Sequence, residues 1–200
     1  MFLPALDTQK SNRAGVCILI RKHFSVRMKR DDPWHTVKPG RCCAAAIQIP
    51  GSGWIVVYSI YLKDGQGPYD DNLDTLTKLV DHINTHGLPF LAGGDWNMEP
   101  QVLMQVPDII AIRGEVATTC KGTCGIGPKD KKVKRSYDYF LVSKKKLCLL
   151  GDVFQLENVF YPHDPVLATL MIQSSEEKVF LPKQRNLARR TSQDWTHKKK

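Results

Sequence analysis

The sequence contains no uninterrupted apolar run close to the roughly 20 residues that a membrane-spanning helix requires. The apolar start at residues 1–6 is too short for a secretory signal peptide. The six cysteines also lack the spacing of a small disulfide-bonded secreted domain, because Cys42 and Cys43 are adjacent and the others are scattered. We therefore expect an intracellular protein with reduced thiols and no membrane insertion.

Acidic residues are the minority among the charged ones, with 20 Asp and Glu against 29 Lys and Arg, which gives a formal charge of +9. This excess favours a polyanionic partner. Nucleic acid is preferred over a membrane surface, because no basic amphipathic stripe indicates an interfacial helix. From about residue 174 the composition becomes polar and basic. We expect one domain over residues 1–173, followed over 174–200 by a basic tail or a linker to a fused domain.

Short β-branched and apolar runs indicate more strands than helices. The expected strands cover residues 15–20, 42–49, 54–61, 88–92, 137–142, 147–154 and 166–172. The second and third flank a glycine-containing turn and should form a hairpin. One helix is expected between capping candidates at Asp70, Asp71 or Asn72 and a C-terminal cap at Gly87. Its apolar residues recur at helical spacing: Leu73, Leu76, Val80 and Ile83.

The run 88–92 ends at the sequence Gly93-Gly94-Asp95-Trp96-Asn97, which places a carboxylate and a carboxamide where a strand meets a loop. Functional residues concentrate at such junctions. The paired glycines allow a phosphate or a metal ion to approach the backbone. The alternative is an Asp-containing turn in which Asn97 caps the next segment.

Asp138 is a single acid within the otherwise apolar run 136–143. A buried carboxylate needs a partner. His163, just before another expected strand, is suitable because a carboxylate fixes the tautomer of an imidazole and raises its basicity. His163 is then a candidate phosphate contact. In the alternative, Asp138 faces outward and His163 belongs to a turn.

These segments resemble, in order, motifs of the endonuclease/exonuclease/phosphatase superfamily, whose members have the DNase I-like fold. Residues 94–97 resemble Gly-Asp-Phe-Asn, 136–139 resemble Ser-x-x-Asp-Tyr, and 163–166 resemble His-x-Pro-Val. Residues 15–19 resemble the Gly-Val-Ala-Ile-Leu strand, and 58–64 the segment with an active-site tyrosine. The match covers about residues 12–172. It looks most similar to the abasic-site and retroelement-type endonucleases.

The resemblance implies a four-layer α/β sandwich and a phosphodiesterase that depends on Mg²⁺ or Mn²⁺, most similar to an endonuclease acting on DNA. Asp95 would hold the metal and activate water, and Asn97 would bind a phosphate oxygen. His163 would contact the same phosphate while Asp138 holds its ring, and Tyr61 would donate to the phosphate. A catalytically inactive nucleic-acid-binding remnant and a phosphoinositide-type phosphatase are the alternatives. Action on DNA would imply a nuclear location.

Basic residues crowd the segment before Asp138: Lys129, Lys131, Lys132, Lys134 and Arg135. In the geometry of the family they would line the approach to the scissile phosphate. We expect Lys132, Lys134 and Arg135 to bind substrate, with Asp64 at a position where the family often has a polar contact. Phosphate contacts of this kind supply affinity and salt dependence without sequence choice.

The sequence departs from the family pattern before residue 15. In the family, a strand, a helix and a strand ending in the main metal-ligating Glu precede that position, whereas here only fourteen residues do and none is Glu. We therefore expect an N-terminally truncated domain that lacks its first strands and helix and has impaired activity. We also expect this loss to leave an open sheet edge beside the strand ending in Asp95.

The closing motif of the family also has an acid before its histidine, where this chain has Pro162, unless Asp164 substitutes from the other side. A zinc site is a further interpretation, with Cys120 and Cys124 as one half and Cys42 and Cys43 as the other. Adjacent cysteines on a strand point to opposite faces, so this pairing is disfavoured.

Overall fold

The computed structural model of the protein describes residues 14–27, 36–119, 121–126, 133–144, 150–156 and 162–171. The helices are α1 (Asp70–His86), α2 (Pro100–Leu103) and α3 (Pro107–Ala111). The strands are β1 (Val26–Arg27), β2 (Thr36–Lys38), β3 (Cys42–Ile49), β4 (Gly53–Tyr61), β5 (Phe90–Asp95), β6 (Gly114–Ala117), β7 (Cys124–Ile126), β8 (Val133–Arg135), β9 (Asp138–Ser143), β10 (Leu150–Gln155) and β11 (Val166–Leu170). The expected α/β class is confirmed. None of the described helices has the length and apolar character needed to cross a bilayer.

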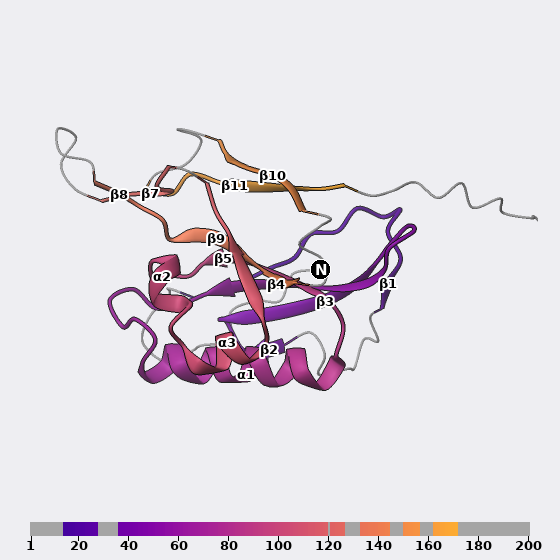
Figure 1. The fold of residues 1–200 in the computed structure, drawn as a ribbon, viewed down its shortest axis with the longest axis horizontal. Helices are drawn as coiled ribbons and strands as arrows, with labels where there is room; N and C mark the ends of the chain where they lie inside the picture. Colours follow the sequence, from indigo (N-terminus) through magenta and orange to yellow (C-terminus); the bar gives the residue numbers. More distant parts are fainter. Residues whose placement is uncertain are drawn as a thin grey trace, which may run out of the picture.

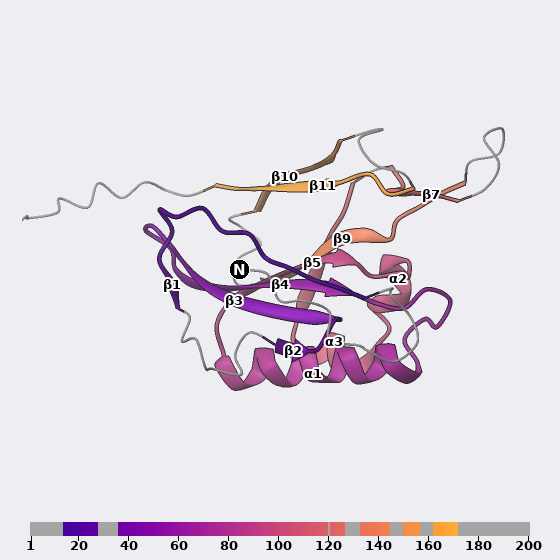
Figure 2. The same cartoon turned by 180° about the vertical axis from the view of Figure 1, so that it is seen from behind.

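The main sheet has the strand order β1-β3-β4-β5-β9-β6, with β2 also paired to β3. Strands β4 and β5 are parallel, because α1 carries the chain back between them, and the other described pairs are antiparallel. Helices α1 and α3 lie on one side of this sheet and the β10–β11 pair lies on the other (Figure 1, Figure 2). The described residues thus form three layers, and no described helix covers the outer side of β10–β11.

Strand β5 is hydrogen-bonded on both sides, to β4 and to β9. The expected open edge beside the strand ending in Asp95 is therefore wrong. The family pattern led us to expect a missing strand at that position. Instead β9 pairs there, with Asp138 directly opposite Asp95.

The expected hairpin and helix are confirmed, with corrections at their ends. β3 and β4 pair from Cys42↔Ile60 to Ile49↔Gly53. Helix α1 ends at Gly87, which has φ 60 and donates its N–H to the Ile83 carbonyl at 2.9 Å. Its N-cap is Tyr69, which makes no side-chain capping bond. The capping candidates are instead the first residues of the helix.

The expected strand at residues 15–20 is wrong, because these residues form no ladder within the described chain. Half-buried and exposed residues alternate along it, as in a strand, and Leu19 is 76% exposed. The Gly15 N–H donates to the Gly40 carbonyl at 3.0 Å. The alternation of apolar and polar residues correctly predicted an extended backbone. A ladder also needs a neighbouring strand in register, which this alternation does not show. Residues 1–13, 145–149 and 172–200, which include the ends of two expected strands and the expected tail, lie outside the described residues.

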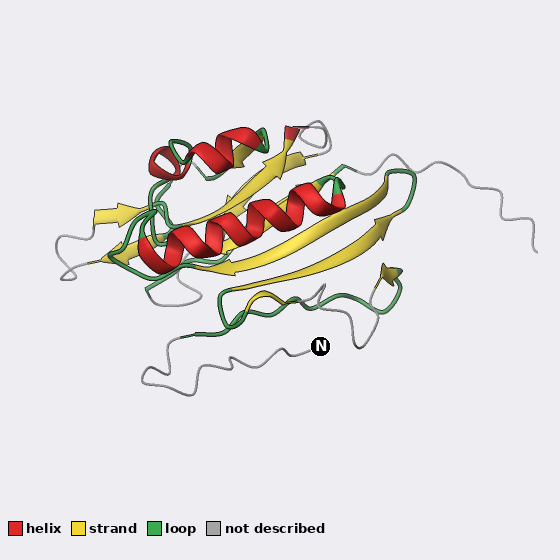
Figure 3. Cartoon of the chain, turned by 90° about the horizontal axis from the view of Figure 1, so that it is seen from below, coloured by secondary structure: helices red, strands yellow, loops and turns green. Residues whose placement is uncertain are grey.

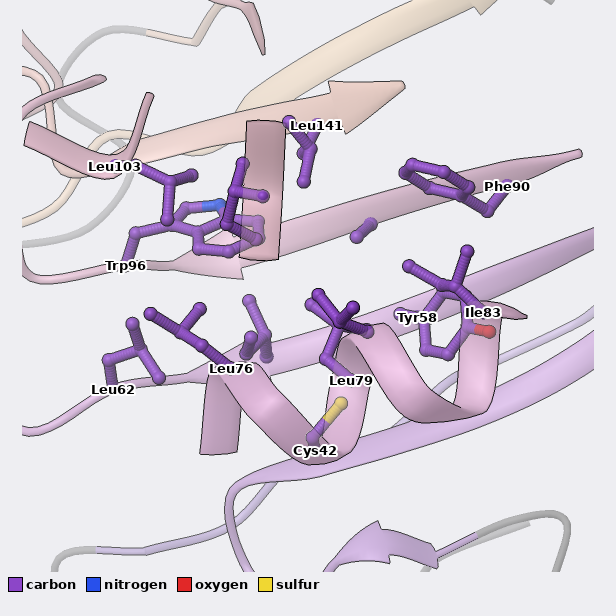
Figure 4. Close-up of a cluster of buried hydrophobic side chains, with 14 of the residues drawn as sticks. Cys42, Tyr58, Leu62, Leu76, Leu79, Ile83, Phe90, Trp96, Leu103 and Leu141 are labelled. Atoms are coloured by element: carbon purple, nitrogen blue, oxygen red, sulfur yellow. The ribbon is translucent and has the colours of Figure 1, made fainter. Parts of the chain in front are cut away.

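The main core lies between α1 and the sheet, seen from the helix side in Figure 3 and in close-up in Figure 4. Trp96 is fully buried there, donates from Nε1 to the Tyr139 carbonyl at 2.9 Å and stacks on the Tyr139 ring. Ile60 of β4 and Leu141 of β9 face the same core from the two strands that flank β5. Because side chains alternate along a strand, the residues next to these core residues point to the opposite face of the sheet.

Lys38 fastens β2 to the start of α1. Its side chain is only 11% exposed, donates to the Asp71 carbonyl at 2.8 Å, and pairs with the carboxylates of Asp71 and Asp74. The Lys38 hydrogen bond lowers the pKa of Asp71 from 3.8 to about 2. A lowered folded-state pKa contributes stability above pH 3.8 that is lost as the pH falls towards 2.

We expect Lys38→Met to lower the free energy of unfolding by about 1 kcal/mol near neutral pH, a value kept small because Asp71 remains partly hydrated. The difference should shrink below about pH 4, where the unfolded chain takes up the Asp71 proton. Urea denaturation at several pH values measures it. Lys78→Met, which removes a more exposed partner of Asp74, is the matched control and should cost less. A pH-independent difference would contradict the role given to Asp71.

Candidate active site

Three polar residues form a row across the middle of the main sheet. In the strand register, Tyr61 of β4 lies beside Asp95 of β5, which lies beside Asp138 of β9. Each is next in sequence to a residue of the helix-side core: Ile60 precedes Tyr61, Trp96 follows Asp95, and Tyr139 follows Asp138. The row therefore lies on the opposite face, towards β10–β11.

His163 completes the group from the segment that leads into β11. Its Nδ1 is 2.8 Å from Asp138 Oδ2, and its Nε2 is 3.9 Å from Asp95 Oδ2. An isolated antiparallel bridge to Cys124 holds its backbone. On either side of the bridge, the Gly125 N–H donates to the Pro162 carbonyl at 2.9 Å and the Asp164 N–H to the Thr123 carbonyl at 2.7 Å.

A pocket of about 380 Å³ lies over this group. Its polar lining includes Asp95, Asp138, His163 and Asp164, and Phe140 and Val166 are among its apolar residues. It therefore lies between the outer face of β5 and β9 and the start of β11. A small anionic group entering it would meet the imidazole and both carboxylates.

The electrostatics of the group favour a bound cation. Burial, and next the nearby Asp138 charge, raise the pKa of Asp95 from 3.8 to about 6. The hydrogen bond to Asp138 raises the pKa of His163. A divalent cation between the carboxylates would relieve their repulsion.

The donor atoms of Asp95, Asp138 and His163 all lie within 4.8 Å of one another, so the three residues could hold a divalent metal ion. Two carboxylates suit Mg²⁺, which prefers oxygen ligands, and Mn²⁺ also accepts an imidazole nitrogen. The residues present therefore fit the metal that the sequence implies, and its identity is part of the proposal below.

Asn97 and Tyr61 lie beside this group with other partners. The Asn97 backbone N–H donates to Asp95 Oδ1 at 3.1 Å, and its side-chain Nδ2 donates to the Leu62 carbonyl at 2.8 Å. Asn97 thus ties the loop after β5 to the end of β4. The Arg41 guanidinium lies over the Tyr61 ring, 5.1 Å from its centre. Their phosphate contacts remain predictions.

The residues predicted to bind substrate are only partly available to it. Lys134 Nζ pairs with Asp164 Oδ2 at 3.0 Å, and Arg135 Nη1 donates to the Tyr137 hydroxyl at 2.7 Å. Asp164 also lines the pocket, so its carboxylate lies between Lys134 and the group. The charge of Asp64 contributes to raising the pKa of Cys124 and that of Arg135. Lys132 lies outside the described residues.

Two further residues shape the group: Thr123, which the sequence did not single out, and Cys124, which it offered only as half of a zinc site with Cys120. Thr123 Oγ1 accepts hydrogen bonds from the backbone N–H groups of Tyr137 at 3.2 Å and Asp138 at 2.9 Å, which fixes the start of β9. Cys124 Sγ lies 3.6 Å from His163 Nε2. Burial, followed by the charges of Asp138 and Asp95, raises the pKa of the Cys124 thiol to about 11.

The predicted zinc partners of Cys124 do not join it. Cys42 lies in the helix-side core, and Cys43 is buried from the other face of β3. Both are free thiols, as are Cys17 and Cys124. Cys120 lies outside the described residues.

The chain has a DNase I-like fold. The chain superposes on the endonuclease domain of TRAS1, a telomere-specific non-LTR retrotransposon, with a TM-score of 0.62 and 12% identity over 78% of this chain and 72% of that one. With the AP endonuclease LMAP from Leishmania major the TM-score is 0.50 and the identity 16%, over 68% of this chain and 55% of that one. No family model and no curated protein matches the sequence. At these identities the likeness establishes the fold alone.

Proposed function

We propose that the protein is a divalent-metal-dependent phosphodiesterase that acts on DNA. The observation that carries the proposal is the convergence of Asp95, Asp138 and His163, which are far apart in the sequence, around one pocket. A metal held by carboxylates beside an imidazole is suited to a phosphodiester, whose charge must be stabilised during hydrolysis. The net charge of +9 favours a polyanionic substrate.

In this proposal Mg²⁺ or Mn²⁺, when bound, neutralises charge on the phosphate oxygens and on the leaving group. Asp95 would ligate the ion and accept a proton from the attacking water. His163, with its ring held by Asp138, donates a hydrogen bond from Nε2 to a phosphate oxygen. Tyr61 and Asn97 complete the phosphate site from the neighbouring strand and loop.

Nicking of supercoiled DNA tests this function. We expect nicking in Mg²⁺ or Mn²⁺ that EDTA abolishes and that added salt weakens, because phosphate contacts release counterions. Salt-sensitive binding without nicking would instead support a non-hydrolysing DNA-binding domain. Release of phosphate from a soluble inositol phosphate, with no nicking, would support the phosphatase alternative.

Asp138→Asn tests the coupling of Asp138 to His163. Removing the carboxylate that orients the ring should lower the nicking rate by about 10–100-fold, with a smaller effect on DNA affinity. The pKa of His163 should also fall, because its hydrogen bond to Asp138 is the main cause that raises it. The pH–rate profile should therefore move to lower pH on the limb that reports His163. Asp152→Asn, an exposed acid on β10, is the control. An unchanged profile would count against the pair.

A further inference from the structure

Cys124 lies against His163 but has no role in the proposed hydrolysis. It is 3% exposed, and its Sγ lies 3.6 Å from His163 Nε2. The two residues face each other across the antiparallel bridge described above, with backbone hydrogen bonds on both sides. The separation of sulfur and nitrogen is therefore set by the backbone of both segments.

This separation matches the geometry of a tetrahedral zinc site. Zinc bonds of about 2.3 Å to sulfur and about 2.0–2.1 Å to nitrogen place the two donor atoms about 3.5–3.6 Å apart at a tetrahedral angle. The Cys124 sulfur and the His163 nitrogen are 3.6 Å apart. Asp95 Oδ2 is 3.9 Å from the same nitrogen, about 0.5 Å beyond the tetrahedral separation of two light donors. Ion binding would therefore require the Asp95 carboxylate to move towards Nε2 by about that amount.

The orientation of the imidazole supports the same ligand set. His163 Nδ1 faces Asp138 Oδ2 at 2.8 Å, so a proton on Nδ1 is donated to that carboxylate. Nε2 then keeps its lone pair, and it lies 3.6 Å from Cys124 Sγ and 3.9 Å from Asp95 Oδ2. A histidine that ligates a metal through one nitrogen usually donates its other N–H to a carboxylate in this way. Asp138 would thus orient the ligand without touching the ion.

We propose that Cys124, His163 and Asp95 form a binding site for Zn²⁺ or a similar thiophilic divalent ion. When the ion binds, the bond between hydrogen and Cys124 Sγ breaks, a sulfur–metal bond forms, and the proton leaves to solvent. The fourth coordination position is open to water. Thiolate ligation selects such ions against Mg²⁺, which prefers oxygen. This ligand set shares Asp95 with the proposed Mg²⁺ site and adds Cys124 and His163.

Binding does not rest on the proposed function, but its consequence for hydrolysis does. Asp95 would ligate either ion, and His163 would contact the phosphate during hydrolysis. An ion held with Cys124 would therefore occupy the residues that position water and phosphate. Zinc would then compete with the ion that supports hydrolysis.

The test uses Co²⁺ as a spectroscopic probe on the full chain, because a cobalt–thiolate bond gives a charge-transfer band in the near ultraviolet. We expect this band in the wild type, its loss in Cys124→Ser, and a weakened or absent band in His163→Ala. Cys17→Ser and Cys120→Ser are controls that remove other thiols, and both should keep the band. Competition with a zinc indicator should show Zn²⁺ affinity at least about tenfold lower in Cys124→Ser than in wild type.

No band in the wild type, a band that persists in Cys124→Ser, or a band lost in either control would overturn the site. Circular dichroism of each variant without metal shows whether it folds. If Cys124→Ser fails to fold, loss of the band in Asp95→Asn together with tenfold weaker Zn²⁺ binding decides the question in its place. The band requires no turnover, so it appears even if the chain fails to hydrolyse DNA. Failure of the proposed function and failure of this site are therefore distinguishable.

Discussion

Replacing Asp95 by Asn is expected to lower metal-dependent DNA nicking by about 10³-fold or more while making the folded protein more stable near neutral pH. The activity falls because the variant lacks both a charged metal ligand and the proposed proton acceptor, and electrostatic stabilisation is usually the largest single contribution to such reactions. Asn keeps the shape of Asp, so the β5 strand and its neighbours should be unchanged.

The stability gain follows from the raised pKa of Asp95. A carboxyl whose pKa rises from 3.8 to about 6 on folding contributes stability below pH 3.8 that is lost as the pH rises through about 6. Above that pH the ionised group lies against the Asp138 charge in a buried position. The neutral amide removes this cost, so the variant should gain about 1–2 kcal/mol at neutral pH and much less near pH 4.

Two measurements check this pair of effects: the nicking rate, and urea denaturation in metal-free buffer at several pH values. Asp81→Asn, on the exposed side of α1, is the matched control and should change neither. Activity within about tenfold of wild type would contradict the role of Asp95. A loss of stability at neutral pH would show instead that the carboxylate makes favourable contacts.

Replacing Gly94 by Ala is expected to lower the free energy of unfolding by more than about 3 kcal/mol. A Cβ at this position would lie 1.9 Å from the Ile60 carbonyl oxygen, and Gly94 has φ +154. The obstacle is backbone of the paired strand β4, which cannot move aside as a flexible side chain can. Urea denaturation measures the loss, and nicking should fall with it because Gly94 precedes Asp95.

Gly65→Ala separates the two causes of the lost stability, which are the clash with the Ile60 carbonyl and the backbone strain of a positive φ. Gly65 also has positive φ, at +73, but a Cβ there would have nothing within 4 Å. It should cost only the backbone strain, about 1–2 kcal/mol. If the two variants lose similar amounts, the close approach of β5 to β4 is not what requires glycine at position 94.

Local signals in the sequence predicted the elements whose causes are local. The 50–53 turn indicated the β3–β4 hairpin, and periodicity with Gly87 indicated α1. The polar residues at strand ends indicated the Asp138–His163 hydrogen bond, since a carboxylate in an apolar strand needs a partner. These features depend on neighbours in the chain or on a general rule of burial.

The features that the sequence did not predict depend on contacts distant along the chain. Residues 15–20 have the alternation of a strand, but alternation carries no information about a ladder partner. Thr123 gave no signal because its role arises from the bonds to β9. Cys124 was interpreted only as a zinc ligand with Cys120, because its contact with His163 arises from the bridge between their segments. The pairing of Lys134 with Asp164 was hidden for the same reason, since charge alone did not show which partner it would find.

Two parts of the site differ in local stability: the row of Tyr61, Asp95 and Asp138, and the bridge that holds His163. The row is part of three central strands, so its geometry can be lost only when the main sheet itself comes apart. The imidazole is held by one isolated bridge with its two flanking hydrogen bonds and by its bond to Asp138, and the bridge can open while the sheet persists. On warming, the protein should therefore pass through a state that retains both carboxylates in register but has released the imidazole. Calorimetry would register such a species as folded, although it could no longer bring the three groups together.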